Sequence, residues 1–214
     1  MKIAYIILTC EKYMTTRVSW QAKTMLSSVD HNDIYYLGHT MDVEKRLFSW
    51  GAGDDYNSLP YKFVDFFRNS DLTYDWFFLI DDDTFVFHDR LLTLLSAYDP
   101  TQKICIGKEL DHIKHMVWGL YMSGGAGTVI SYPVYKELCD YLKPRTNAEV
   151  IYHYCADICL GMWMKKLSGI KMVDHPQFHT DKYDKEKDSA EDAITFHHLK
   201  TWEDYETCTG LLKN

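Results

Sequence analysis

The chain has 214 residues, of which 46% are hydrophobic and 25% are charged. This length and composition suit one large α/β domain, and we take residues 1–214 as a single domain. The formal net charge of −8 argues against nucleic acid as a partner. An acidic protein can bind a diphosphate well only if a cation offsets the repulsion, so any phosphate-binding hypothesis here includes a metal.

The apolar runs and the cysteines argue against a membrane-spanning protein and against a disulfide-rich secreted one. No run approaches the roughly 20 apolar residues of a membrane span. The apolar stretch 3–9 is too short for a signal peptide and has no small-residue cleavage site, so it is typical of a first strand. The six cysteines show no CxxC spacing, which favours free thiols over a disulfide framework. We therefore expect a soluble, cytoplasmic protein without a membrane span.

Strand and helix patterns alternate along the first half of the chain. The predicted elements are a strand (2–9), a helix (15–28), a strand (33–39), a helix from Pro60, a strand with an acidic corner (75–87), a helix (88–98) and a strand (103–107). A Gly-rich segment (122–131) leads into a helix (132–142), followed by a helix near 155–167, short strands near 169–173 and 193–199, and a C-terminal helix. This order predicts an α/β sandwich with a largely parallel sheet.

Three aspartates, Asp81, Asp82 and Asp83, directly follow the apolar run 76–80. Ligands of α/β sheets bind at the carboxyl ends of strands, and a cation there would relieve the repulsion among three carboxylates. In an extended chain Asp81 and Asp83 point to one side and Asp82 to the other. A D-x-D pair can thus hold Mg2+ or Mn2+ through oxygen ligands. The alternative is a solvated acidic turn, which the preceding apolar run disfavours.

Histidines offer further metal ligands. His197 is the candidate third ligand because a strand end in the second half could face the aspartates and imidazole tolerates Mn2+. Periodicity does not separate His197 from His198. His112 and His115 have i, i+3 spacing, but the absence of nearby carboxylates favours an ordinary role for them.

Two other features leave their role open. The glycines of SGGAG (123–127) let a backbone approach a ligand, although Gly-rich turns are common. The segment lacks the GxxxxGK[ST] and GxGxxG patterns, which argues against ATP and dinucleotide binding. Asp157 begins an apolar helix pattern and is either a helix-capping residue or a functional carboxylate.

Four blocks occur in order: YDWFFLIDDDTFVFHDRLLTLLSAYDP (74–100), SGGAGTVIS (123–131), ADICLG (156–161) and TFHHLK (195–200). Together they resemble the fringe-like and β1,3-glycosyltransferase group, with the core-1 galactosyltransferases, whose motifs include W-F-x-x-x-D-D-D-T-[YF]-V, E-D-x-x-x-G and F-H-Y-V. The resemblance implies the GT-A fold, a Rossmann-like, nucleotide-sugar-binding three-layer sandwich with a mixed, mainly parallel central sheet. It also implies a nucleotide-binding half (1–110) and an acceptor or catalytic half (111–214).

The resemblance assigns roles to particular residues. It implies that the metal, Mn2+ or Mg2+, is bound by Asp81, Asp83 and His197, that Asp157 is the catalytic base, and that the nucleotide sugar lies near Thr9, Cys10, Asp81, Asp82, Ser123, Gly124 and Gly125. One position departs from the family pattern: Ala156 stands where the family usually has an acidic residue beside the base.

The activity implied is inverting, metal-dependent transfer of a hexose or deoxyhexose from a UDP-sugar to a hydroxyl of a glycan or glycoprotein. The alternatives are a retaining transferase of the same fold, a metal-dependent phosphohydrolase and a non-catalytic carbohydrate-binding module. The compact length resembles a microbial or viral member, such as the capsid-decorating glycosyltransferases of large algal viruses, which act in the host cytoplasm. We expect a monomer or part of a longer polypeptide.

Overall fold

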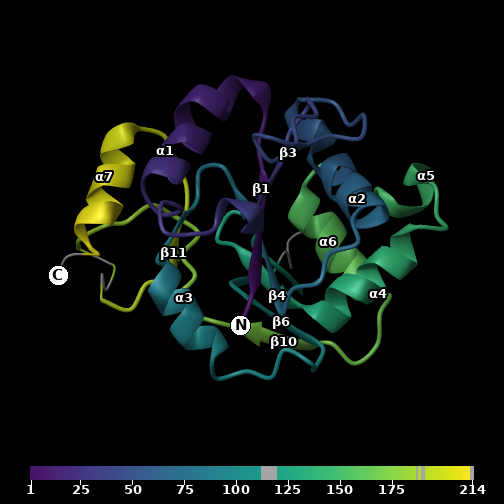
Figure 1. Cartoon of the computed structure of the whole chain (residues 1–214). Coiled ribbons are helices and arrows are strands. Elements are labelled where there is room, and N and C mark those ends of the chain that lie inside the picture. The colour runs from purple at the N-terminus through teal and green to yellow at the C-terminus, as the bar shows by residue number, and fades with distance from the viewer. Residues whose placement is uncertain (112–119, 187, 189–190, 213–214) are drawn as a thin grey trace.

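A seven-stranded sheet forms the middle layer of the computed structural model, which describes residues 1–111, 120–186, 188 and 191–212 (Figure 1). From edge to edge the strands are β10 (Lys171–Asp174), β6 (Ile104–Gly107), β9 (Thr128–Ser131), β4 (Trp76–Asp81), β1 (Ile3–Leu8), β2 (Ile34–Leu37) and β3 (Leu47–Phe48). Strand β9 is antiparallel to its neighbours β4 and β6, and the other neighbouring pairs are parallel. The sheet is therefore mixed and mainly parallel, as predicted.

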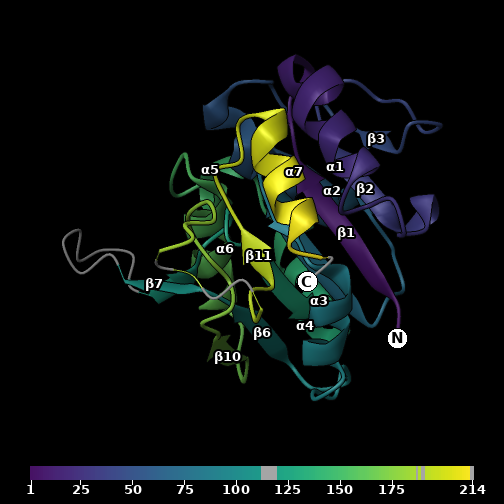
Figure 2. The same ribbon diagram turned by 90° about the vertical axis from the view of Figure 1, so that its left-hand side faces the viewer.

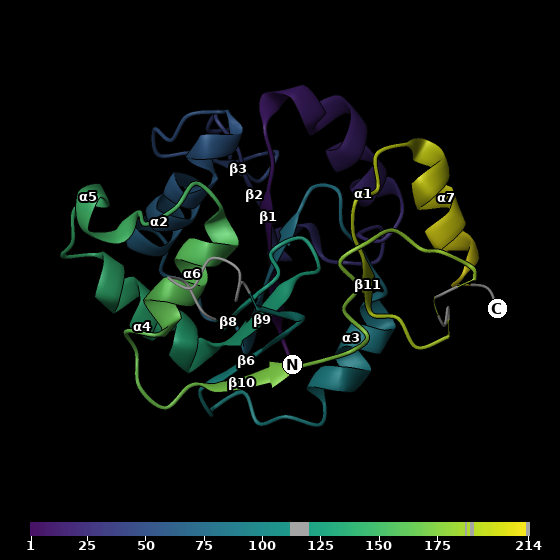
Figure 3. The same cartoon turned by 180° about the vertical axis from the view of Figure 1, so that it is seen from behind.

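Helices cover both faces of this sheet because its central strands are apolar on both sides. Alternate residues of β1 belong to two separate hydrophobic clusters. One cluster lies under α1 (Ser19–Lys23), α3 (His88–Leu95) and α7 (Trp202–Gly210), which stand in front of the sheet in Figure 2. The other lies under α2 (Leu59–Asn69), α4 (Tyr132–Leu142) and α6 (Ala156–Met164), on the far side of the sheet, with the short α5 (Asn147–Val150) beyond them (Figure 3). This arrangement confirms the three-layer sandwich.

Two small ribbons lie outside the main sheet. The antiparallel ribbon of β5 (Phe85–Val86) and β11 (Thr195–Phe196) joins the two halves of the chain. A second antiparallel ribbon pairs β7 (Glu109–Asp111) with β8 (Leu120–Met122). No helix among the described residues is long and apolar enough to cross a membrane.

The first predicted helix is wrong in form. In place of one helix over 15–28, a π-helical turn covers Met14–Val18 and is followed by the short α1. Thr24 ends the helix, with φ −114° and ψ −98°, and its hydroxyl donates to the Trp20 carbonyl at 2.7 Å. A Thr hydroxyl that bonds to the backbone competes with helical hydrogen bonding.

The Gly-rich segment 122–131 is more than the turn expected from its glycines, because its second half is the buried strand β9. Gly127 has φ +92°, and a Cβ there would lie 2.6 Å from the Phe78 ring. Glycine therefore lets the chain turn tightly against β4 and return antiparallel to it. The β-branched residues that follow suit a buried strand.

Candidate functional site

The acidic corner at residues 81–84 is braced through its backbone carbonyls. Gln21 Nε2 donates to the carbonyls of residues 81 and 84, at 3.1 and 2.9 Å. The Tyr205 hydroxyl, from α7, donates to the carbonyl of residue 82 at 2.8 Å, and the Leu199 backbone N–H donates to that of residue 83 at 3.0 Å. Residues from the N-terminal and the C-terminal parts of the described chain thus hold the loop at the carboxyl end of β4 in place.

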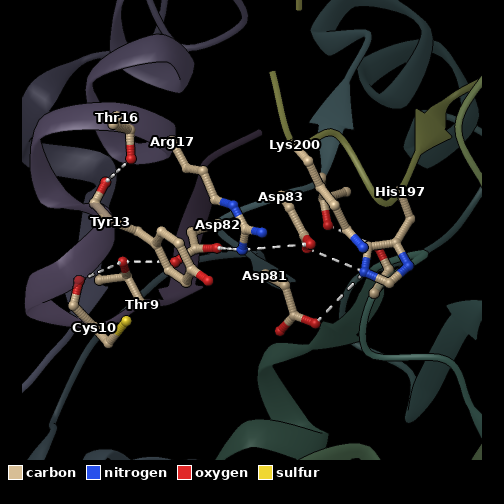
Figure 4. Close-up of polar contacts among 12 residues, drawn as sticks. Thr9, Cys10, Tyr13, Thr16, Arg17, Asp81, Asp82, Asp83, His197 and Lys200 are labelled. Atoms are coloured by element: carbon tan, nitrogen blue, oxygen red, sulfur yellow. Dashed lines mark hydrogen bonds and ion pairs between the residues drawn. The ribbon is translucent and has the colours of Figure 1, made fainter. Parts of the chain in front are cut away.

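His197 faces this corner because β11 pairs with β5, the strand that follows the aspartates. Its Nε2 lies 3.1 Å from Asp83 Oδ1 and 3.9 Å from Asp81 Oδ2 (Figure 4). Its Nδ1 lies 3.1 Å from the Thr180 carbonyl. A ring that donates Nδ1–H to a carbonyl presents Nε2 to a metal, which is the usual arrangement for metal-binding histidine. The residues present therefore fit a divalent cation.

Gly125 provides the space that the His197 ring occupies. A Cβ at this position would lie 2.1 Å from His197 Cε1 and 2.3 Å from its Nε2. The Gly125 carbonyl accepts a hydrogen bond from Thr84 Oγ1 at 2.7 Å. The Gly-rich turn is therefore in direct contact with the metal side of the corner.

Asp82 points away from His197, toward Arg17. Arg17 Nη1 lies 2.9 Å from Asp82 Oδ1 and 3.5 Å from Asp83 Oδ2, and the guanidinium stacks on the Tyr13 ring at 3.8 Å (Figure 4). The buried Thr9 hydroxyl donates to Asp82 Oδ2 at 2.8 Å. Asp81 and Asp83 thus both face His197, whereas Asp82 faces Arg17. Residues 82 and 83 lie in a turn after β4, so this division does not come from the alternation of an extended strand.

The charges of the corner shift one another's pKa values. Burial and the charge of Asp83 raise the pKa of Asp81. For Asp83, burial opposes ionisation, but His197 and Arg17 outweigh it and the pKa is lowered. For His197, burial favours the neutral ring, but Asp83 and Asp81 outweigh it and the pKa is raised. Without a cation, a protonated His197 is the main compensation on this side of the corner.

Asp157 lies in the first turn of α6, with Gly124 beside it. Its Oδ2 accepts from the Gly124 N–H at 3.2 Å, and its Oδ1 accepts from the Ile158 N–H at 2.8 Å. Burial raises the Asp157 pKa in spite of these two hydrogen bonds. Ala156, which stands where the family usually has an acidic residue, is only 6% exposed and packs in the hydrophobic core. The surroundings of this position are therefore apolar. Asp157 is therefore the one carboxylate of the segment 156–161.

Two adjoining hollows connect these groups. A cleft of about 370 Å³ is lined by Arg17, Asp81, Asp82, Asp83, His197, His198, Thr9, Cys10, Lys62 and Tyr56, among others. A smaller hollow of about 50 Å³ is lined by Asp81, Gly124, Tyr56 and Asp157. Asp81 and Tyr56 belong to both linings, so the acidic corner and Asp157 face one continuous space. Its larger part is within the usual range for ligand pockets.

The structure thus brings most of the predicted site residues together. Ser123 differs from the others, since it is buried and its Oγ accepts from the Ala126 N–H at 3.2 Å within the Gly-rich turn. His112 and His115 lie outside the described residues. Arg17 and Lys62 were missing from the predicted site. Lys62 is almost fully buried, and its Nζ donates to the Thr9 carbonyl at 2.6 Å and pairs with Asp54 at 3.0 Å.

A mixed, mainly parallel sheet between two layers of helices is the arrangement of the GT-A class of glycosyltransferase folds. The crystal structure of the glycosyltransferase GlyE from Streptococcus pneumoniae matches 97% of this chain and 61% of its own, with a TM-score of 0.59 and 15% identity. A glycosyltransferase involved in the glycosylation of the major capsid of PBCV-1 matches over 97% of this chain and 99% of its own, with a TM-score of 0.55 and 12% identity. These likenesses concern the fold alone.

The chain belongs to the Fringe-like family, whose model matches residues 2–209. A relative from Xenopus laevis, glycoprotein-N-acetylgalactosamine 3-beta-galactosyltransferase 1, is 34% identical over 104 residues. That match covers 47% of this chain, and the chain spans 28% of the relative's length. The resemblance found in the four sequence blocks is therefore confirmed.

Proposed function

We propose that the chain is an inverting, metal-dependent glycosyltransferase that moves a hexose or deoxyhexose from a UDP-sugar to a hydroxyl of a glycan or glycoprotein. The observation that carries this proposal is the shared cleft, with the carboxylate–histidine corner in one part and Asp157 in the other. Family membership favours this activity over a phosphohydrolase or a sugar-binding module.

The donor would bind along the larger cleft. Asp81, Asp83 and His197 would hold Mn2+ or Mg2+, since their oxygen and nitrogen atoms converge and His197 Nδ1 is already paired with a carbonyl. A bound divalent cation would neutralise the charge that develops on the departing diphosphate. Arg17, at the same corner, would add a fixed positive charge in an otherwise acidic protein.

The acceptor would enter beside Asp157. Burial favours the protonated acid, so the carboxylate gains driving force to accept a proton from the attacking hydroxyl. The Gly124 and Ile158 N–H groups fix both of its oxygens, which orients the base. Tyr56 is 63% exposed at the edge of both hollows, and its ring offers an apolar wall against which a sugar face could rest. The hydroxyl oxygen would attack the anomeric carbon as its bond to the diphosphate breaks.

Asp157→Asn separates base catalysis from donor binding. We expect transfer to fall by about 10²- to 10⁴-fold, the usual contribution of a general base. Donor binding should persist, so Mn2+ with the correct nucleotide sugar should still raise the melting temperature of the variant by mass action. Asp89→Asn is the matched control, because Asp89 is also in the first turn of a helix, α3, but is exposed and outside the cleft.

Normal transfer by Asp157→Asn would refute the assignment of the base. Absence of a thermal shift with every uridine or guanosine sugar would contradict the proposed function itself. The anomeric configuration of the product, measured by NMR, distinguishes inversion from retention. Phosphate release without an acceptor would identify a phosphohydrolase instead.

A further inference from the structure

His198 is carried by a turn that places its ring beside that of His197. In an extended strand, consecutive side chains point to opposite faces. His198 has φ +63°, which is the left-handed region that few residues with a Cβ adopt. The two imidazole rings consequently stack, with centroids 3.8 Å apart and planes inclined by 29°.

Hydrogen bonds on both sides hold this turn. The His197 backbone N–H donates to the Asp181 carbonyl at 3.1 Å, and the Leu199 N–H donates to the Asp83 carbonyl at 3.0 Å. The Leu199 side chain is fully buried, which anchors the chain directly after the turn. The backbone of His198 is therefore tied to the acidic corner, while its ring is exposed and lines the larger cleft.

The ligand atoms of three side chains converge at this point. One ligand atom each from Asp83, His197 and His198 lies within 4.8 Å of the other two. Asp81 Oδ2 adds an oxygen 3.9 Å from His197 Nε2. Small rotations of the half-buried His197 and the exposed His198 would bring both rings and the buried Asp83 carboxylate onto one ion, and the cleft leaves the remaining positions of that ion open to phosphate oxygens or water.

We propose that His198 is a second imidazole ligand of the divalent cation, so that the site combines two ring nitrogens with the carboxylates of Asp81 and Asp83. This inference rests on the proposed metal-dependent function and specifies its metal. Mg2+ is bound mainly by oxygen ligands, whereas imidazole suits later transition metals, whose affinities rise from Mn2+ to Co2+. The site should therefore favour Mn2+ and Co2+ over Mg2+.

His198→Gly tests this ligand while keeping the turn. Glycine adopts a positive φ without steric cost, so the variant loses the imidazole but not the backbone conformation. In the presence of UDP, we expect Mn2+ affinity measured by calorimetry to fall by at least about tenfold, on the order of the losses seen when metal sites lose supporting groups. The affinity for Co2+ should fall more than that for Mg2+. The melting temperature of the metal-free variant should not fall.

Electron spin echo measurements on bound Mn2+ give a direct readout, because they count coordinated imidazole nitrogens. Two imidazoles are expected in the wild-type protein and one in His198→Gly. His31→Gln is the control, since His31 is an exposed histidine that does not line the cleft.

The two proposals fail in different ways. A single imidazole on Mn2+ in the wild-type protein, or equal losses of Mg2+ and Co2+ affinity in His198→Gly, would overturn the assignment of His198 and leave the transferase proposal standing. If the wild-type protein binds no divalent cation even with UDP, the proposed metal dependence itself is wrong.

Discussion

Asp157 combines a burial that opposes its ionisation with hydrogen bonds that favour it. Burial dominates, and its pKa lies above the ordinary value of about 3.9 for aspartate. The fold therefore binds a proton at Asp157 more tightly than the unfolded chain does. The stability that this proton contributes is fully present below the ordinary pKa and is lost as the pH rises through the raised one. A buried base of this kind costs stability at the pH where it is ionised.

This cost predicts how Asp157→Asn alters the pH dependence of stability. Asparagine cannot ionise, so the melting temperature of the variant minus that of the wild type should become more positive as the pH rises from about 4. Asparagine also accepts only one of the two N–H hydrogen bonds that Asp157 accepts. The loss of stability from the missing hydrogen bond does not depend on pH. Thermal melts of the metal-free proteins from acid to neutral pH measure the difference. A difference that stays constant with pH would contradict the raised pKa.

Gly125 is a second residue whose identity the site requires. Gly125→Ala would place a methyl group 2.1 Å from the His197 ring, so the ring must leave its position between Asp83 and the Gly-rich turn. We expect Mn2+ affinity to fall by about tenfold or more, as when other groups that orient a ligand are lost. Gly210→Ala in α7 is the control, because nothing lies within 4 Å of a Cβ there. Calorimetric Mn2+ titrations that give equal affinities for the two variants would refute the requirement.

At the scale of elements, the π-helical turn Met14–Val18 explains how Arg17 reaches the acidic corner. Single π-helical turns are rare in proteins, and those that occur often lie at functional sites. This one follows β1, the parallel neighbour of β4, and it carries Arg17 across to Asp82 and Asp83. The Arg17 and Asp82 side chains are only 14% and 7% exposed, so each depends on the other for compensation.

Removal of this guanidinium should therefore be costly. Arg17→Met leaves Asp82 buried without its cation, and we expect a loss of about 3 kcal/mol in the free energy of unfolding. Lys45→Met removes a cation from an exposed pair with Asp42, where solvent screens the interaction, and should change stability little. Urea denaturation of the metal-free proteins measures both. Equal effects of the two substitutions would show that Asp82 does not depend on Arg17.

The elements that sequence patterns predict well are those with long apolar runs. The run 76–80 fixes β4, and the charge pattern that follows marks the acidic corner, because both signals are local. Strand β9 was missed because its four residues sit between a glycine turn and a helix pattern. The role of Arg17 was missed for a different reason: its pairing depends on the register of β1 with β4, which no local pattern encodes.

Local sequence patterns do not predict how the two adjacent histidines are oriented. Adjacent residues of a strand face opposite sides, and the sequence does not show which side faces the aspartates. Periodicity therefore could not decide between His197 and His198. The structure has both rings at the cleft, because a left-handed turn at His198 cancels the alternation. Such a turn is stabilised by Leu199 and its distant partner Asp83, so it belongs to the tertiary structure rather than to the local sequence.

At the scale of the whole molecule, both hydrophobic clusters share the central strands, and the proposed site lies where the two halves of the chain meet. The predicted division into a nucleotide-binding half (1–110) and a catalytic half (111–214) stays a prediction. The contacts across it are extensive at the cleft, since β11 from the second half pairs with β5 from the first.

The hydrogen bonds from Gln21, Leu199 and Tyr205 to the acidic corner have a consequence for folding during synthesis on the ribosome. Chains are synthesised from the N-terminus, so β1, β2 and β4 emerge and can begin to pair long before the last two of these donors exist. Until residues 197–205 have emerged, the carbonyls of residues 82 and 83 must be satisfied by water, and the aspartates have no His197 beside them. The nascent chain therefore carries its acidic loop exposed until residues 197–205 have been synthesised, and the proposed metal site can form only after that point.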